Sequence, residues 1–187
     1  AAWATFYTKS TFARYARVRA ASGLTGAEAA AQLLHSQGIH NVTIEPTQGF
    51  LSDHYDPLSR KLRLSPDVYA SPSLSAIGVA CHEAGHALQH AHGYLPLSLR
   101  SALVPATQLG SNLSYILFLI GFLMGAPLLI KWGILLFGLV VVFALVTLPV
   151  EWNATARAKA LMVQAGIVSP SESERAGAVL NAAFMTY

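Results

Sequence analysis

Two histidines and a glutamate lie within five residues of one another in the stretch His82-Glu83-Ala84-Gly85-His86. On an α-helix, residues four apart lie on the same face, so the ring nitrogens of His82 and His86 can bind one metal ion. The carboxylate of Glu83 then lies beside a water molecule on that ion and can accept a proton from it. This spacing is typical of the catalytic site of a zinc peptidase.

The same stretch could instead belong to a buried helix whose two histidines are merely hydrogen-bonded. The chain has seven histidines and six glutamates among 187 residues. With this composition, roughly one chain in a hundred would show the motif by chance. However, the motif interrupts an otherwise apolar run, residues 77–81 before it and 87–88 after it. Because a buried charge without a partner is costly, the sequence favours a metal site.

A helix must carry this motif, and the flanking residues predict one within residues 73–92. Ser71-Pro72-Ser73 is typical of the start of a helix, and residues 74–91 contain no proline. Gly93 is expected to end it. The sequence therefore places both histidines and the glutamate on one helix.

A catalytic zinc ion has three protein ligands and keeps its fourth position for water, so a third ligand is needed. Glu151 is favoured because an ionised carboxylate directly after an apolar segment is costly unless it binds a cation. His92 has the spacing of the metzincin pattern, ten residues after His82, but Gln89 replaces the glycine that this pattern requires. The remaining candidates are Asp53, His54 and Asp56.

The composition indicates a membrane protein. Hydrophobic residues make up 53% of the chain and charged residues only 11%, well below the quarter that is usual in soluble domains. The net charge is +3 and the basic residues are scattered, which argues against nucleic acid as a partner. Cys81 is the single cysteine, so an internal disulfide is excluded.

Two uncharged runs, 113–130 and 133–150, can each span about 27 Å as a helix, enough for the hydrocarbon core of a bilayer. Lys131 and Trp132 separate them and are expected to form the tip of a transmembrane helical hairpin. Pro127 is expected to kink the first of these helices, and residues 94–112 are expected to form a linker. The sequence thus predicts a lipid bilayer as one partner.

The basic residues also predict which side of the membrane the metal helix occupies. Arg100, Arg157 and Lys159 flank the ends of the hairpin, whereas the tip carries only Lys131. The positive-inside rule therefore places the metal helix in the cytoplasm. A reducing compartment agrees with the lone thiol.

The rest of the chain predicts a mainly α-helical fold with a small β-sheet (α+β). Helices are expected over 3–20, 27–36 and 151–164 and from 170 onward, and strands over 41–45, 50–55 and 61–64. In many zinc peptidases an edge strand beside the metal helix pairs with the backbone of the substrate, and the last two strands are the candidates. A purely structural sheet is the equal alternative.

This organisation divides the chain into three parts. Residues 1–112 are expected to form the N-terminal part of a catalytic domain, and residues 113–150 the membrane hairpin. Residues 151–187 are expected to form the C-terminal part, which carries the third ligand. Besides the metal motif, six other stretches are distinctive: Lys9-Ser10-Thr11-Phe12, Ser22-Gly23-Leu24-Thr25-Gly26-Ala27-Glu28, Asp53-His54-Tyr55-Asp56-Pro57, Arg63-Leu64-Ser65, Leu99-Arg100-Ser101-Ala102-Leu103-Val104-Pro105 and Leu148-Pro149-Val150-Glu151.

Together these stretches resemble the bacterial neutral zinc metallopeptidases of the YugP-like kind over nearly the whole chain. The resemblance implies an integral membrane peptidase of the bacterial plasma membrane, with a gluzincin-like catalytic domain related to those of HtpX and the CAAX prenyl peptidases. It implies zinc as the cofactor, His82 and His86 as ligands, Glu83 as the catalytic base and Glu151 as the third ligand. Family members usually have a further hydrophobic segment at each end, so this chain is expected to be a trimmed core.

One position departs from the related gluzincins. These often have an aspartate four residues after the glutamate ligand, where it orients a metal-bound histidine. Here the position is Thr155, so either Thr155 or Asn153 is expected to serve. His54, Tyr55 and Arg157 are the candidates for stabilising the developing oxyanion or contacting substrate.

The resulting functional hypothesis is an endopeptidase that hydrolyses membrane-associated or unfolded polypeptides near the cytoplasmic leaflet. The alternative is a non-catalytic membrane adaptor with a structural zinc site, which would need four protein ligands. His90 or His92 could complete that set. The physiological substrate, the oligomeric state and any partner subunit stay open.

Overall fold

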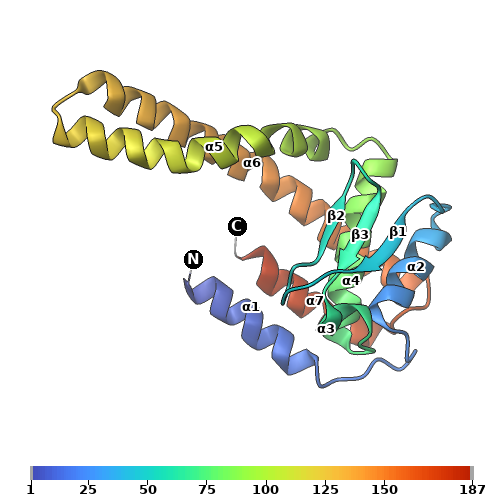
Figure 1. Cartoon of the computed structure of the whole chain (residues 1–187). Helices are drawn as coiled ribbons and strands as arrows, with labels where there is room; N and C mark the ends of the chain where they lie inside the picture. The colour runs from blue at the N-terminus through green and yellow to red at the C-terminus, as the bar shows by residue number, and fades with distance from the viewer. Residues whose placement is uncertain (1, 186–187) are drawn as a thin grey trace. The chain divides into compact units, whose positions relative to one another are not determined.

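The computed structural model describes residues 2–185. It is mainly α-helical with one small sheet, which confirms the predicted fold class (Figure 1). In chain order the elements are α1 (Ala2–Tyr15), α2 (Gly26–Ser36), β1 (Thr43–Pro46), β2 (His54–Asp56), β3 (Lys61–Leu64), α3 (Pro66–Tyr69), α4 (Leu74–Ala91), α5 (Leu95–Leu123), α6 (Pro127–Gln164) and α7 (Pro170–Phe184).

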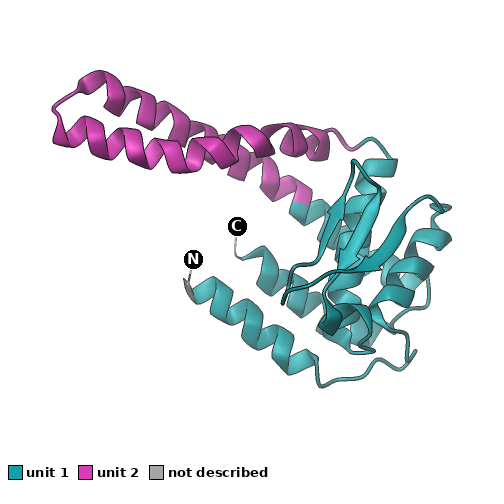
Figure 2. Cartoon of the chain, in the orientation of Figure 1, with its two compact units in different colours: residues 1–93, 151–186 teal, residues 94–150, 187 magenta. Residues whose placement is uncertain are grey.

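The chain divides into two compact units, coloured separately in Figure 2. The first unit comprises Ala1–Gly93 together with Glu151–Thr186. The second, which we call the hairpin unit, comprises Tyr94–Val150. Since α6 runs from the hairpin unit into the first unit, residues 151–164 of this helix belong to the first.

Helix α4 is the centre of the first unit. It packs against α1, α2, α3, α7 and the sheet. The Ser73 hydroxyl caps its first turn by accepting a hydrogen bond from the Ala76 backbone at 3.2 Å, and its end is followed by Gly93 at φ +63°. Serine at the cap and glycine after the last turn satisfy the free backbone groups of the two ends. The structure thereby confirms a helix within the predicted range 73–92.

The sheet has the strand order β1-β3-β2, with β1 parallel and β2 antiparallel to β3. Leu62 and Leu64 are buried, whereas Lys61 and Arg63 lie on the opposite face and form ion pairs with Glu45. The strand predicted over 50–55 is shorter than expected and begins only at His54. Gly49 and Leu51 have φ of +105° and +52°, so the preceding residues form a turn instead of a strand.

Local capping signals place α2 and α7. Thr25 and Glu28 form a capping box at the start of α2, and Ser169 and Glu172 form another at the start of α7. The first helix is shorter than the predicted 3–20, because α1 ends at Tyr15. The backbone that follows turns away to pair with the start of α4, where the Val18 carbonyl accepts a hydrogen bond from the Leu74 backbone at 2.9 Å.

Three expectations for the hairpin unit are wrong. Residues 95–112 are part of α5, not a linker: Pro96 lies in its first turn, where proline is tolerated, and Pro105 is accommodated inside the helix. The tip lies at residues 124–126, not at Lys131 and Trp132. Pro127 does not kink a helix but begins α6. Gly125, at φ +61°, makes the turn between the two helices.

Both hairpin helices are long and apolar enough to cross a membrane. Large apolar side chains are exposed along both of them, among them Phe118, Phe122, Leu135 and Phe137. The hydroxyl groups of Ser114 and Thr147 donate hydrogen bonds of 2.8 Å to carbonyls of their own helices, at Ser111 and Phe143. Apolar surfaces with internally satisfied polar groups are what hydrocarbon requires, and they indicate association with a membrane.

Candidate metal centre

His82, His86 and Glu151 form a cluster in the first unit. One potential ligand atom from each lies within 4.8 Å of the others. The Nε2 atom of His82 is 3.1 Å from Oε2 of Glu151, and that of His86 is 3.6 Å from the same oxygen. The side chains of His86 and Glu151 are buried, and that of His82 is only 15% exposed. The structure thus brings the favoured third residue to both histidines.

A glycine in the middle of the motif permits this arrangement. A Cβ atom added to Gly85 would lie 2.8 Å from the carbonyl oxygen of Ala154. Real side chains do not approach backbone oxygen so closely, so only glycine lets α4 and this part of α6 pack at this distance. Ala154 lies one helical turn after Glu151, and the close packing therefore brings that carboxylate to the histidines.

The other ring nitrogen of each histidine is held by a polar side chain. Nδ1 of His82 lies 3.3 Å from the Thr155 hydroxyl, and Nδ1 of His86 lies 3.0 Å from Oε1 of Gln89. When Nδ1 carries the proton and donates it, Nε2 keeps its lone pair. Both lone pairs then face the space beside Glu151. Two imidazole nitrogens and one carboxylate oxygen are a donor set that fits a catalytic zinc ion.

Gln89 extends this support into a chain of hydrogen bonds. Its Nε2 donates to Oδ1 of Asn153 at 3.0 Å, and the same oxygen accepts a hydrogen bond of 2.8 Å from Nε of Arg157. Sequence reasoning noted Gln89 only as a departure from the metzincin pattern. The available signal was its position three residues after His86 on a face that is buried in the structure.

The electrostatics of the cluster favour a cation. Burial alone lowers the pKa of His86, but its hydrogen bond to Glu151 and the charges of Glu83 and Glu151 outweigh the burial and raise that pKa. The negative charge that favours a protonated imidazole also favours a metal ion in its place. The residues present therefore fit the binding of a divalent cation.

Glu83 directly follows His82 on α4, and its negative charge contributes to the raised pKa of His86. Burial raises the pKa of Asp53, which lies just before β2, and the charge of Glu83 raises it further, so the two carboxylates are close enough to interact. Asp53 accepts hydrogen bonds from the Ser65 backbone at 2.7 Å and from the Ser65 hydroxyl at 3.1 Å. Its carboxylate is thus engaged with the segment before α3, outside the metal cluster.

The other sequence candidates from the strand region lie on two faces of β2. The Tyr55 hydroxyl is 2.8 Å from Nδ1 of His90 on α4. His54 and Asp56 point the opposite way, as alternate residues of a strand do, and both lie near Arg63. The structure therefore brings Tyr55 to the metal helix and leaves His54 and Asp56 on the far face of the sheet.

His92 and Arg157 lie together at the end of α4. The guanidinium of Arg157 is 3.2 Å from Nδ1 of His92. His92 lies outside the cluster of three, which leaves Glu151 as the candidate that meets both histidines among residues 2–185.

Replacing Gln89 by Leu is expected to weaken zinc binding by about 10–100-fold, because His86 loses the acceptor that fixes its ring. Zinc affinity would be measured by competition with a chromophoric chelator. Gln37→Leu, at an exposed position, is the matched control. Gln89→Glu keeps the acceptor and should restore most of the affinity. Equal affinities of the Leu variant and the control would contradict the role of Gln89.

Comparison with known proteins agrees with this geometry. A family described as "Putative neutral zinc metallopeptidase" matches residues 1–187. The chain belongs to this family. It is 48% identical over 185 residues to a protein named "Putative membrane protease YugP" from Bacillus subtilis (strain 168), an alignment that covers 99% of this chain and 82% of that protein. No solved structure matches the chain. The zinc named by the family agrees with the donor set of His82, His86 and Glu151.

Proposed function

We propose that this member of the family is a membrane-anchored zinc endopeptidase that hydrolyses membrane-associated or unfolded polypeptides. His82, His86 and Glu151 are the zinc ligands, and Glu83 is the catalytic base. The observation that carries the proposal is the convergence of both Nε2 atoms on the Glu151 carboxylate, with Glu83 on the same helix.

Each residue has a defined task in peptide hydrolysis. When bound, zinc would polarise the scissile carbonyl and acidify a water molecule. Glu83 accepts the proton of the attacking water on its carboxylate and then delivers it to the nitrogen of the leaving amine. Thr155 and Gln89 hold the rings of His82 and His86 so that Nε2 faces the ion.

Strand β2 is the element best placed to bind the substrate backbone. It pairs with β3 on one side and forms an edge of the sheet on the other, and it packs against α4. The backbone N–H and C=O groups of an edge strand can pair with an extended peptide. Such a peptide would run beside α4, the helix that carries Glu83.

The candidates for stabilising the oxyanion differ in their positions. Tyr55 faces α4, and Arg157 joins the hydrogen-bonded chain that ends at His86. His54 faces away from α4 and hydrogen-bonds to the Ser52 carbonyl at 2.8 Å. This placement favours Tyr55 or Arg157 over His54 as the donor.

The rival function is a membrane adaptor with a structural zinc ion. A structural site needs a fourth protein ligand, and the proposed candidates were His90 and His92. His90 is hydrogen-bonded to the Tyr55 hydroxyl, and His92 lies beside the permanently charged Arg157, so each has a partner outside the cluster. A cluster of three supports a site with an open position and hence the peptidase.

The proposal places the first unit on the cytoplasmic side of the bacterial plasma membrane. Arg100 and Arg157 lie near the ends of the hairpin that are distant from its turn, whereas Lys131 lies near the turn. The positive-inside rule supports this orientation. Accessibility of an engineered cysteine in the 124–126 turn to a membrane-impermeant thiol reagent in intact cells would test it; no labelling there would contradict it.

Removal of zinc by a chelator is expected to abolish casein hydrolysis by the detergent-solubilised chain, and added zinc should restore it. The reason is that the three ligands hold the ion that acidifies the water molecule. Residual hydrolysis after complete zinc removal would contradict the proposal. Zinc that is present without any hydrolysis would instead favour the adaptor.

A further inference from the structure

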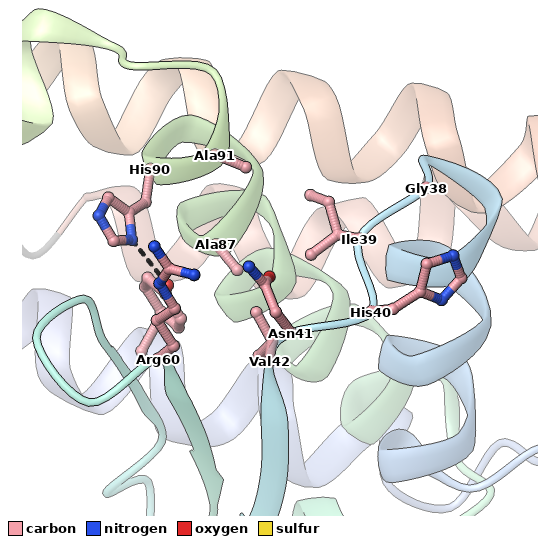
Figure 3. Close-up of a pocket in the computed structure, with 10 residues that line it drawn as sticks. Gly38, Ile39, His40, Asn41, Val42, Arg60, Ala87, His90 and Ala91 are labelled. Carbon is pink, nitrogen blue, oxygen red and sulfur yellow. Dashed lines mark hydrogen bonds between the residues drawn. The ribbon is translucent and has the colours of Figure 1, made fainter.

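A pocket of about 550 Å³ lies in the first unit, beside the end of α4 (Figure 3). Three segments enclose it: the connection from α2 to β1, the β2–β3 hairpin, and the last two turns of α4. Its polar lining residues are His40, Asn41, Tyr55, Arg60 and His90, and its apolar surface includes Val42 and Ala87. The proposed function does not use this pocket.

Arg60 lies in the turn between β2 and β3 and lines the pocket. In Figure 3 the side chains of Arg60 and Asn41 extend toward Ala87 of α4. The turn between β2 and β3 therefore presents a guanidinium group to the pocket.

The backbone at Arg60 is unusual for an arginine. Its φ is +52°, in the left-handed region where glycine is favoured, and its carbonyl accepts a hydrogen bond from the Thr43 backbone at 3.0 Å. A non-glycine residue there costs on the order of 1 kcal/mol. Arg60 lines the pocket and is exposed to solvent, so its guanidinium is accessible to a ligand.

Arg60 differs from the neighbouring basic residues of β3 in having no acidic partner among residues 2–185. Lys61 and Arg63 form ion pairs with Glu45, at 2.9 and 2.8 Å. Among residues 2–185, no carboxylate forms an ion pair with Arg60. The pocket thus contains a permanent positive charge that the described part of the chain does not neutralise.

His90 adds a second polar group to the same wall. Its Nδ1 lies 2.8 Å from the Tyr55 hydroxyl. When the hydroxyl donates to Nδ1, Nε2 carries the proton and becomes a hydrogen-bond donor. The Asn41 amide supplies further donors. A guanidinium with neighbouring N–H donors above an apolar floor suits a carboxylate on an aliphatic stem.

The pocket is adjacent to the candidate metal centre along two elements. Ala87 directly follows His86 on α4, and His90 lies one helical turn later. On the strand side, the Tyr55 hydroxyl of β2 lies 2.8 Å from Nδ1 of His90, which is one helical turn beyond His86 on α4. A peptide along β2 would thus have a side chain near the pocket within about two or three residues of the scissile bond.

We propose that this pocket is a substrate subsite that binds a carboxylate of the polypeptide through Arg60. The carboxylate is an aspartate or glutamate side chain near the cleaved bond, or the C-terminal carboxylate of a short peptide. The inference rests on the proposed function, since it names the class of polypeptide that the same metal centre cleaves.

Binding can be tested without turnover, in the full-length Glu83→Gln protein loaded with zinc. Fluorescence anisotropy would compare peptides that contain one glutamate with peptides that contain glutamine at the same position, each with a free and with an amidated C-terminus. Tighter binding by about tenfold is expected for the carboxylate-bearing peptides. If the peptide binds more weakly when glutamate is replaced by glutamine, the bound carboxylate is that of a side chain. If it binds more weakly when the C-terminus is amidated, the bound carboxylate is that of the C-terminus.

Arg60→Gln and Arg60→Glu should reduce the ratio of these affinities to about one or invert it, and Arg17→Gln, at an exposed position of the first unit, is the matched control. The same two Arg60 substitutions can also be made in the chain that keeps Glu83 and can therefore cleave. Cleavage-site profiling of a peptide mixture by these variants should show the same loss of preference for carboxylate-bearing peptides. An unchanged ratio in the Arg60 variants would overturn the subsite. Absence of cleavage by wild type, with the affinity ratio intact, would instead overturn the proposed function and leave the pocket as a carboxylate-binding site.

Discussion

Glu83→Gln is expected to retain zinc and to lose casein hydrolysis by about 10²–10⁴-fold, the usual contribution of a general base. Glutamine has the size of glutamate but cannot accept the proton of water. Zinc should stay bound because the proposed ligand atoms come from His82, His86 and Glu151 and not from Glu83. The measurement is zinc content per chain together with the initial rate of casein hydrolysis in detergent.

Glu174→Gln is the control for this variant, because Glu174 is an exposed glutamate on α7. It should hydrolyse casein as the wild type does. If Glu83→Gln were fully active, Glu83 would not be the base, and the proposed mechanism would be wrong. If the variant lost zinc as well as activity, the role of Glu83 would be in binding the ion or in folding.

Glu151→Ala is expected to lose both zinc and activity. Loss of a residue that only orients a ligand costs about 10–100-fold in metal affinity, and loss of a ligand should cost more. The variant also removes the carboxylate that lies 3.1 Å from His82 and 3.6 Å from His86. Zinc content after gel filtration and affinity by chelator competition measure the effect, with Glu174→Ala as the control.

The two variants together separate the two functions. An inactive Glu83→Gln that keeps zinc and an inactive Glu151→Ala that loses it would support the peptidase with its ligands assigned. If wild type and both variants held zinc and none cleaved, Glu151 would not be a required ligand. The adaptor with a structural ion would then be the better explanation.

Local chemistry explains which parts of the fold could be predicted from the sequence. Capping residues such as Thr25 and Ser169 act on the nearest turn, so the starts of α2 and α7 were predicted within a residue. The strand Lys61–Leu64 was predicted at its observed bounds, because its alternation of charged and apolar residues matches the two faces of the sheet. These signals need no knowledge of distant contacts.

The hairpin was misjudged because charge was used to locate its tip. Lys131 and Trp132 interrupt the apolar run, yet they lie inside α6. The turn follows backbone chemistry instead: Gly125 adopts positive φ, and Pro127 begins the next helix. Hydropathy thus identified both apolar segments but not the point where the chain reverses.

In the candidate site, the motif on α4 could be read directly, because its residues are neighbours in the chain. Glu151 could be proposed from its position after the apolar segment. Gln89 could not, because its role depends on Asn153, which reaches it only after α6 packs against α4. The proposed subsite at Arg60 depends on the segments that line the pocket and on the pairing of Lys61 and Arg63 with Glu45, and both require the folded sheet.

In the sequence, the hairpin unit lies between the residues of the candidate metal cluster, so the ribosome makes them at different times. His86 leaves the ribosome before residues 94–150, and Glu151 follows them. At about 5–20 residues per second, the interval between these two ligands is roughly 3–13 s of translation. A nascent chain that ends within the hairpin unit has two of the three proposed ligands, so under the proposed function an interrupted product would be inactive. Completion of the proposed active site is thereby timed to follow synthesis of both apolar helices.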